Sequence, residues 1–303
     1  MASKLTAAQR RAIRRRERVI EGALFLAAAS SVFVTLGIVG VLLYESATFF
    51  AHVSVVDFLT DTVWTPLFAE PRYGILPLLC GTLLSTLVAL AVAAPLGLTA
   101  ALYLSEFAHP TVREIVKPAL ELLSGVPTVV YGFFALLFVT PLLQKTILPS
   151  LPGFNILSAG IVIGIMIIPY VASLSEDAMR AVPQGLRDSS LALGATRLET
   201  AVKVVLPAAT SGVAAAFVLG ISRAVGETMV VAIAAGQQPN LTLDPREPAA
   251  TITAYIVQVA LGDLPHGSIG YQSIFAAGLM LFLMTLAFNI FAFWLRLRYR
   301  EAY

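Results

Sequence analysis

The sequence predicts an all-α membrane protein with six transmembrane helices, and three observations lead to this fold class. Of its 303 residues, 58% are hydrophobic and only 13% are charged, which is far more apolar than a soluble core requires. The apolar residues gather in runs of about 20, the length that crosses a bilayer. The basic residues fall mostly in alternate connecting segments, as they do in multi-pass membrane proteins.

Six apolar runs are long enough to cross the membrane. They cover residues 22–44, 76–104, 121–144, 156–175, 206–236 and 272–295. The second contains Pro95 and Gly97, and the fifth contains Gly212, Gly220 and Gly226. Because Pro and Gly in membrane helices are tolerated where neighbours satisfy the freed backbone groups, we expect these two spans to be tilted or broken.

The first run follows a basic N-terminal segment, an arrangement that also occurs in signal peptides. The uncharged run 22–44 is longer than the apolar part of a signal peptide, which has about 7–15 residues, so we expect an uncleaved helix. The chain then divides into a basic N-terminal segment (1–20), a first helix with an external loop (21–75), a core of five membrane helices (76–295) and a short tail (296–303).

The distribution of lysine and arginine predicts the orientation. Sixteen of the 20 lie in the N-terminal segment, the 105–120 and 176–205 loops and the tail. The opposite side carries only Arg72, Lys145 and Arg246, and Arg223 lies within a span. The excess of positive charge marks the cytoplasmic side, so we expect both termini in the cytoplasm, as an even number of crossings requires.

The residue types needed for enzymatic chemistry are not assembled in this sequence. A phosphate-binding P-loop needs a Gly-Lys pair, and no lysine here follows a glycine. The three histidines (His52, His109 and His266) are scattered, and Cys80 is the only cysteine. We therefore expect no catalytic, metal or cofactor site in this chain.

The loop 176–207 has the composition of a docking segment. It is helix-forming, is interrupted at Pro183 and Gly185, resumes near Asp188 and leads to Leu206 and Pro207, where we expect the next membrane helix to open. Three apolar residues lie within it: Leu191, Leu193 and Leu198. Composition alone fits equally well an amphipathic connector on the membrane surface.

The spacing in this loop resembles the EAA loop of bacterial ABC importer permeases, whose pattern is EAA-x3-G-x9-I-x-LP. Asp188-Ser189-Ser190 and Gly194 are followed at the matching distance by Val204-Val205-Leu206-Pro207, with Asp for Glu, Ser for both Ala and Val for Ile. In that family the loop forms a coupling helix that fits a cleft on the ATPase subunit. The resemblance implies that segment 188–197 does so here. The ATPase-coupling residues that it implies are Asp188, Ser189, Ser190, Leu191, Gly194, Ala195, Arg197, Leu206 and Pro207.

The stretch SGVPTVVYG, residues 124–132, interrupts a helix where a membrane span begins. Gly125 and Pro127 free backbone groups that lipid cannot satisfy, so we expect them to face protein or a cavity. The candidate cavity residues are Ser124, Gly125, Pro127, Thr128 and Tyr131. A kink used only for packing is the alternative.

The stretch SRAVGETM, residues 222–229, places two charges in an apolar run. An arginine at the centre of a membrane helix costs about 2.5–3.5 kcal/mol, and an acidic residue costs a similar amount. Four positions apart, Arg223 and Glu227 would share one helical face and pair. Arg223 would supply positive charge to an anion path, because its planar fork binds two oxygens, and Glu227 would hold it. Ser222 and Thr228 would donate hydroxyls or bond their own backbone. An ion pair that fixes helix register is the alternative.

These two stretches, together with IIPYVASLSEDAMRAVP at 167–183, resemble in their order the permeases of the phosphate-specific ABC importer. The resemblance covers the chain from about residue 75 onward, and the basic N-terminus favours the C type of the two paired permeases. It implies a type I ABC importer permease fold of the MetI-like kind in the inner membrane. Implied partners are a second permease subunit, two cytoplasmic ATPase subunits that bind ATP and Mg²⁺, an extracytoplasmic phosphate-binding protein and lipid, but no nucleic acid.

Three other functions stay open from the sequence. The same machine could carry another oxyanion, such as sulfate or molybdate. A secondary transporter would use Arg223 and Glu227 as a proton relay, but it leaves the spacing of the coupling loop unexplained. A sensory or scaffold membrane protein would transport nothing by itself.

Overall fold

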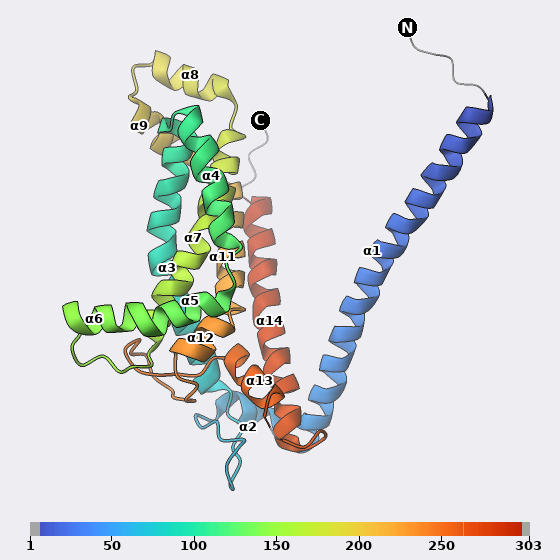
Figure 1. Ribbon diagram of the computed structural model, residues 1–303, viewed down its shortest axis with the longest axis vertical. Helices are drawn as coiled ribbons and strands as arrows, with labels where there is room; N and C mark the ends of the chain where they lie inside the picture. Colours follow the sequence, from blue (N-terminus) through green and yellow to red (C-terminus); the bar gives the residue numbers. More distant parts are fainter. Residues whose placement is uncertain (1–6, 263, 299–303) are drawn as a thin grey trace.

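A computed structural model describes residues 7–262 and 264–298 of the chain, and its regular elements there are helices (Figure 1). They are α1 (Ala7–Phe50), α2 (Val55–Thr60), α3 (Leu76–Leu102), η1 (Tyr103–Phe107), α4 (Pro110–Ser124), α5 (Thr128–Phe134), η2 (Ala135–Val139), α6 (Thr140–Thr146), α7 (Ile156–Arg180), α8 (Gln184–Ala192), α9 (Arg197–Thr200), η3 (Ala201–Val205), α10 (Leu206–Ala208), α11 (Thr210–Val225), α12 (Met229–Ala234), α13 (Ile252–Ala260) and α14 (Ile269–Arg298). The three η segments are π-helical.

The helices α3, α7, α11 and α14 stand upright side by side and form the body of the molecule (Figure 1). The contact between α3 and α7 is the most extensive, because glycines let the two backbones approach closely. A Cβ atom on Gly160 would lie 2.6 Å from Val88, and one on Gly164 would lie 2.7 Å from Val92. Small residues therefore set the spacing between these two helices.

Five helical stretches in the described part of the chain are long and apolar enough to cross a membrane. They are 16–50, 76–107, 128–146, 156–180 and 269–294. The bent pair 197–208 and 210–225 makes a sixth if it is counted as one span. The prediction of an all-α protein with about six membrane helices is confirmed. The first predicted span, 22–44, is part of the longer helix α1.

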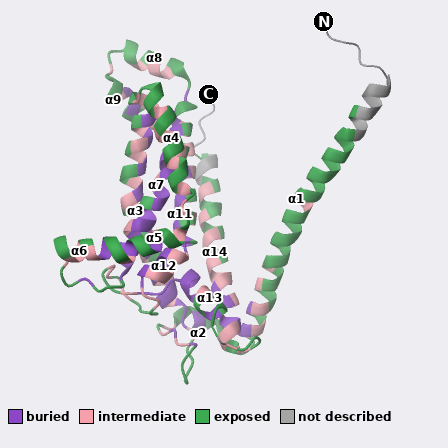
Figure 2. Cartoon of the chain, in the orientation of Figure 1, coloured by how far each residue is buried: buried purple, intermediate pink, exposed green. Residues whose placement is uncertain are grey.

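Helix α1 leans away from the body of the molecule over most of its length and meets it at the α2 end (Figures 1 and 2). Most of its apolar side chains are exposed, including Phe25 and Phe33 at 72% and 74%. Near its C-terminal end it reaches α14, where Leu42 lies against Gly278 and Phe49 is fully buried. The helix is thus anchored at one end only among the described residues.

The predicted span 121–144 begins later than expected. Residues up to Ser124 belong to α4, which stands beside α7, whereas α5, η2 and α6 lie across the upright helices (Figure 1). The helix stops at Gly125, and Pro127 has an extended backbone before α5 begins. Pro disfavours helical geometry in the residue before it, which explains the break.

The two long predicted spans behave differently from each other. Helix α3 continues through Pro95 without a break, and the π-helical η1 prolongs it to Phe107. The fifth span is broken twice: the axis bends by 74° between residues 208 and 210, and three residues separate the end of α11 at Val225 from the start of α12 at Met229. The pair Leu206–Pro207 therefore ends the segment before the bend and does not open the membrane helix.

The end of the molecule opposite α8 is held by an aromatic cluster. Trp64 is almost completely buried, and its ring meets that of Tyr255 edge to face at 4.9 Å between centroids. Phe49, Phe58 and Tyr73 complete the cluster with further edge-to-face pairs. These contacts join the end of α1 and the segment around α2 to α13, and edge-to-face geometry is the favourable one for aromatic rings.

Candidate functional site

The two helix breaks predicted from the sequence are brought together by the packing of α5 on α12. Gly132 of α5 is buried, and a Cβ atom there would lie 2.8 Å from Ile233 Cδ1 and 3.1 Å from the carbonyl oxygen of Met229. Both helices lie across the upright bundle, between the end that carries α8 and the end that carries α2 (Figure 1). The breaks at 125–127 and 226–228 thus belong to one region, which we call the break region.

The predicted ion pair between Arg223 and Glu227 does not form. Helix α11 ends at Val225, so the two residues do not share a helical face. Glu227 is only 3% exposed, and its carboxylate accepts hydrogen bonds from the backbone N–H groups of Met229 at 3.1 Å and Val230 at 3.3 Å. Glu227 therefore caps the start of α12, because a carboxylate satisfies the free N–H groups that a helix start leaves.

Arg223 is exposed and makes no hydrogen bond or ion pair with any other residue that the structure describes. Its guanidinium group is thus available to a ligand, a partner or water. Ser222 has a buried hydroxyl without a hydrogen-bond partner among the described residues, and the Thr228 hydroxyl donates to the carbonyl of Gly226 at 3.2 Å. Thr228 therefore bonds the local backbone, which was one of its two expected roles.

The break at 124–132 is satisfied largely by its own side chains. The hydroxyl of Tyr131 donates to the carbonyl oxygen of Leu123 at 2.9 Å, across the break, and the hydroxyl of Ser124 donates to the carbonyl of Glu121 at 2.7 Å. Gly125 and Pro127 are exposed and Thr128, at the start of α5, is half-buried. The polar groups of Ser124 and Tyr131 thus serve the local structure.

The predicted coupling segment lies at the opposite end of the upright helices from α2 (Figure 1). Its first part belongs to helix α8, which starts after Pro183, so Asp188 lies in the middle of that helix and not near a helix start. Gly194 then makes a turn with φ +88°, a conformation that favours glycine. Helix α9 begins after Thr196, whose side chain forms a capping box with Glu199. The segment 188–197 is therefore the second half of α8, a turn and the first residue of α9.

The surface around α8 is apolar where a loop in water would be polar. Leu191, Leu193 and Leu198 are 44%, 90% and 58% exposed, and no residue of α8 is fully buried. Ser190 is one of the few polar groups of α8 with a partner outside it, since its hydroxyl lies 2.9 Å from that of Thr200 in α9. Exposed leucines next to Asp188 and Arg197 are typical of a protein-docking surface.

The sequence reading missed the ion pair that ties α8 to the membrane helices. Arg187 of α8 pairs with Glu106 of η1 through two hydrogen bonds, of 3.0 and 2.9 Å. Its guanidinium also donates to the carbonyls of Val182 at 2.6 Å and Met179 at 2.8 Å. No local spacing points to this contact, because the two charged residues are 81 positions apart.

A second buried carboxylate was also missed. Glu176, in α7, is completely buried and accepts hydrogen bonds from Arg113 at 2.7 Å and Lys117 at 2.8 Å, both in α4. Lys117 also bonds Asp177. Partial burial of the ammonium acts to lower the pKa of Lys117, but the hydrogen bonds to Asp177 and Glu176 outweigh it, so this pKa is raised. The network fastens α4 to α7.

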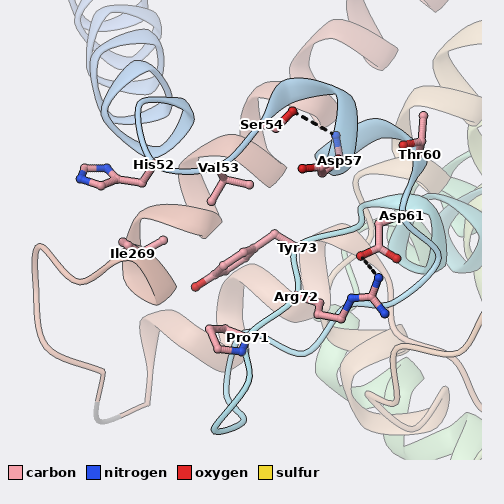
Figure 3. A pocket seen from close by; sticks show the side chains of 10 residues that line it. All are labelled: His52, Val53, Ser54, Asp57, Thr60, Asp61, Pro71, Arg72, Tyr73 and Ile269. Carbon is pink, nitrogen blue, oxygen red and sulfur yellow. Dashed lines mark hydrogen bonds and ion pairs between the residues drawn. The ribbon is translucent and has the colours of Figure 1, made fainter.

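A pocket of a different kind lies at the α2 end of the molecule (Figure 3). Asp57, Asp61 and Arg72 are its charged lining residues, and Arg72 is paired with Asp61 at 2.9 Å. Tyr73 and His52 contribute rings to the lining. Because two carboxylates face one guanidinium that is already paired, the charge of this pocket disfavours an anion.

Comparison with known proteins agrees with this architecture. Residues 93–301 match the family described as binding-protein-dependent transport system inner membrane component. The "Probable ABC transporter permease protein YqgH" of Bacillus subtilis is 36% identical over 88% of this chain and 84% of its own length. The phosphate transport system permease protein PstC of Mesorhizobium japonicum is 32% identical over 86% of this chain and 84% of its own.

A solved structure gives the same fold at low identity. A chain of a bacterial ABC transporter involved in the import of the acidic polysaccharide alginate superposes with a TM-score of 0.64 at 18% sequence identity, over 96% of this chain and 99% of that one. The predicted type I ABC importer permease fold is therefore confirmed. The chain belongs to the family of inner membrane components of binding-protein-dependent transport systems.

Proposed function

We propose that this chain is the membrane-spanning permease subunit of an ATP-driven phosphate importer. The observation that carries the proposal is the similarity, over more than four fifths of the chain, to the PstC phosphate permease. The permease provides the path, and chemistry takes place elsewhere in the complex. The relatives are transport permeases and not enzymes.

We assign Arg223 to the anion path. It is the exposed guanidinium at the end of α11, next to the break region, and it lacks an internal partner among the described residues. A planar guanidinium binds two oxygens of a phosphate at once. Glu227 acts differently from the sequence expectation: it holds the start of α12 and leaves the charge of Arg223 uncompensated.

We assign the surface of α8 and α9 to the ATPase. The exposed Leu191 and Leu193 offer apolar contact, and Asp188 and Arg197 offer charge around them. The α8 end of the molecule then faces the cytoplasm, together with both termini. ATP and Mg²⁺ bind the partner ATPase subunits, two per complex. A second permease subunit completes the path, and a phosphate-binding protein delivers phosphate at the α2 end.

Uptake of labelled phosphate into proteoliposomes that contain the whole complex tests this assignment. The comparison is native protein against Arg223→Gln at equal assembly, with Arg180→Gln as a variant that removes the same charge from the end of α7. A charge-assisted hydrogen bond contributes about 1.5–3 kcal/mol, so losing it slows uptake by about tenfold or more. We expect this loss for Arg223→Gln and native uptake for Arg180→Gln.

Three results would contradict the proposal in different ways. Native protein that imports labelled sulfate but not phosphate would show a permease for another oxyanion. Phosphate uptake that survives in Arg223→Gln would place the anion path away from α11. Uptake that follows a proton gradient without ATP would favour a secondary transporter.

A further inference from the structure

We propose that Arg187 and Glu106, which we call the clamp, transmit the movement of α8 into the membrane helices. This inference rests on the proposed function and deepens it, since it names the contact that couples ATP hydrolysis to the transport path. Arg187 is a positioning residue in this scheme: it touches neither phosphate nor ATP. It joins the docking helix to two helices of the bundle at once.

The geometry of the clamp is that of a stiff connection. Two nitrogens of Arg187 meet the two carboxylate oxygens of Glu106 at 3.0 and 2.9 Å, a fork-on-fork contact that fixes orientation as well as distance. Both side chains are only 11% exposed, so water competes little for these bonds. Ser105 donates a further hydrogen bond of 2.6 Å to the same carboxylate.

The same guanidinium also holds the end of α7. It donates to the carbonyl oxygens of Met179, in the last turn of α7, and Val182, just beyond it. Helix C-termini leave such carbonyls without partners and carry partial negative charge, so a cation satisfies both needs. One side chain thus connects the middle of α8 to the ends of both α3 and α7.

The rest of α8 is lightly held. None of its residues is fully buried, and among the described residues the side-chain hydrogen bonds from α8 to α3, η1 or α7 all come from Arg187. Leu186 adds an apolar contact to the cluster around Met179 and Val182. Ser190 bonds Thr200 in α9, a contact within the same loop. A push on the exposed face of α8 therefore reaches α3 mainly through the clamp.

The helical segment that receives the push is itself irregular. Glu106 lies in η1, a π-helical turn at the end of α3, and the segment η3 beside α8 is π-helical too. Single π-helical turns often occur at functional sites, because the wider turn interrupts the regular ladder of hydrogen bonds. The clamp thus ends on a π-helical turn, which differs from the regular α-helix α3 that precedes it.

The test separates transport from hydrolysis in the reconstituted complex. Proteoliposomes that contain native protein, Arg187→Gln, Arg187→Lys or Glu106→Gln are supplied with the phosphate-binding protein. Labelled phosphate taken up and ATP hydrolysed are measured in the same sample. Arg180→Gln is the matched control, because it removes the same charge near Glu106 without removing the fork: Arg180 acts on Glu106 through its charge alone and lies 3.8 Å from Glu176.

We expect the three clamp variants to assemble with the ATPase and to hydrolyse ATP while phosphate moved per ATP falls by about tenfold. Arg187→Lys should fail as well, since an ammonium cannot form the fork. Arg180→Gln should keep the native ratio. The double variant Arg187→Gln with Glu106→Gln should be no worse than Arg187→Gln alone, because Glu106 acts through Arg187.

Other outcomes would contradict the proposed role of the clamp. If uptake and hydrolysis fall in proportion, Arg187 serves docking or folding and transmits nothing. If the ratio is native in all variants, movement passes elsewhere, and loss of assembly in all three variants would make the pair a folding contact. Native protein that imports no phosphate would instead refute the proposed function, and this is read from the native sample alone.

Discussion

Gly132 of α5 packs directly against Ile233 of α12, with no room for a side chain between them. The contact joins two helix breaks that lie about a hundred positions apart in the sequence. Both breaks therefore border one interface. Its closeness is set by the missing Cβ atom, which has a direct consequence for stability.

Substitution of Gly132 by Ala should destabilise the protein. The new Cβ would meet Ile233 Cδ1 at 2.8 Å, and such overpacking costs about 1–3 kcal/mol. The thermal unfolding of purified protein should shift to lower temperature. Gly153→Ala, where nothing lies within 4 Å, is the control, and the double variant Gly132→Ala with Ile233→Val should recover part of the loss, because valine lacks the Cδ1 atom.

Tyr131→Phe should lower stability without changing how phosphate binds. The hydroxyl of Tyr131 donates its hydrogen bond to the carbonyl of Leu123, and such a hydrogen bond contributes about 1 kcal/mol to stability. Thermal unfolding should report the loss, while the KM of uptake stays native. If Tyr131→Phe instead raises the KM of uptake and leaves the unfolding temperature unchanged, Tyr131 contributes to the anion path.

Substitutions of Arg223 and of Glu227 should affect different properties: loss of Glu227 should lower stability, and loss of Arg223 should leave stability unchanged. Glu227→Ala removes the acceptor for two backbone N–H groups at the start of α12, and losing a helix cap costs about 0.5–2 kcal/mol. Arg223→Gln touches no described partner, so its unfolding temperature should be native. Unfolding measured side by side on the two variants checks this, and equal losses would mean that the residues support each other after all.

Glu176→Gln should loosen α4. The carboxylate accepts hydrogen bonds from Arg113 and Lys117. Removing one partner of a fully buried ion pair costs about 3–5 kcal/mol. We expect a smaller loss of stability here, because both cations are partly exposed. Hydrogen exchange should rise across α4, and Glu114→Gln, on the same helix, is a suitable control. If hydrogen exchange across α4 in Glu176→Gln stays at the native level, apolar contacts alone hold α4.

The contribution of Lys117 to stability should vanish in alkali. Its pKa is raised in the folded protein, so the contribution is complete below the ordinary lysine pKa of 10.5 and disappears as the pH passes the folded value. The unfolding of native protein and of Lys117→Met should therefore differ at neutral pH and converge in strong alkali. A constant difference across this range would contradict the role of the ammonium.

The helical membrane class could be predicted because it rests on local composition. A run of apolar residues such as 156–175 must become a helix in a bilayer, where every backbone polar group needs an internal partner. The turn at Gly194 and the interruption at Pro127 were also visible, since Gly and Pro restrict or free the backbone at their own positions. Boundaries were less well predicted: α7 runs on to Arg180 and α8 starts before Asp188.

Partners of side chains could not be predicted in the same way. The spacing of Arg223 and Glu227 indicated a pair only if one helix carried both, and the break at Gly226 removes that condition. The contact between Arg187 and Glu106 joins residues 81 positions apart, and nothing in either local sequence marks the other.

By itself, then, the sequence determined an all-helical multi-pass membrane protein with a loop that resembles the EAA loop and a charged stretch at 222–229, because hydrophobic length, charge bias and motif spacing are local properties of the chain. Only the tertiary structure decided that Glu227 caps α12, that Arg223 stays unpaired among the described residues and that Arg187 joins α8 to η1. The reason is physical: a hydrogen bond depends on where the fold brings its donor and acceptor within about 3 Å, and distance along the chain does not determine this.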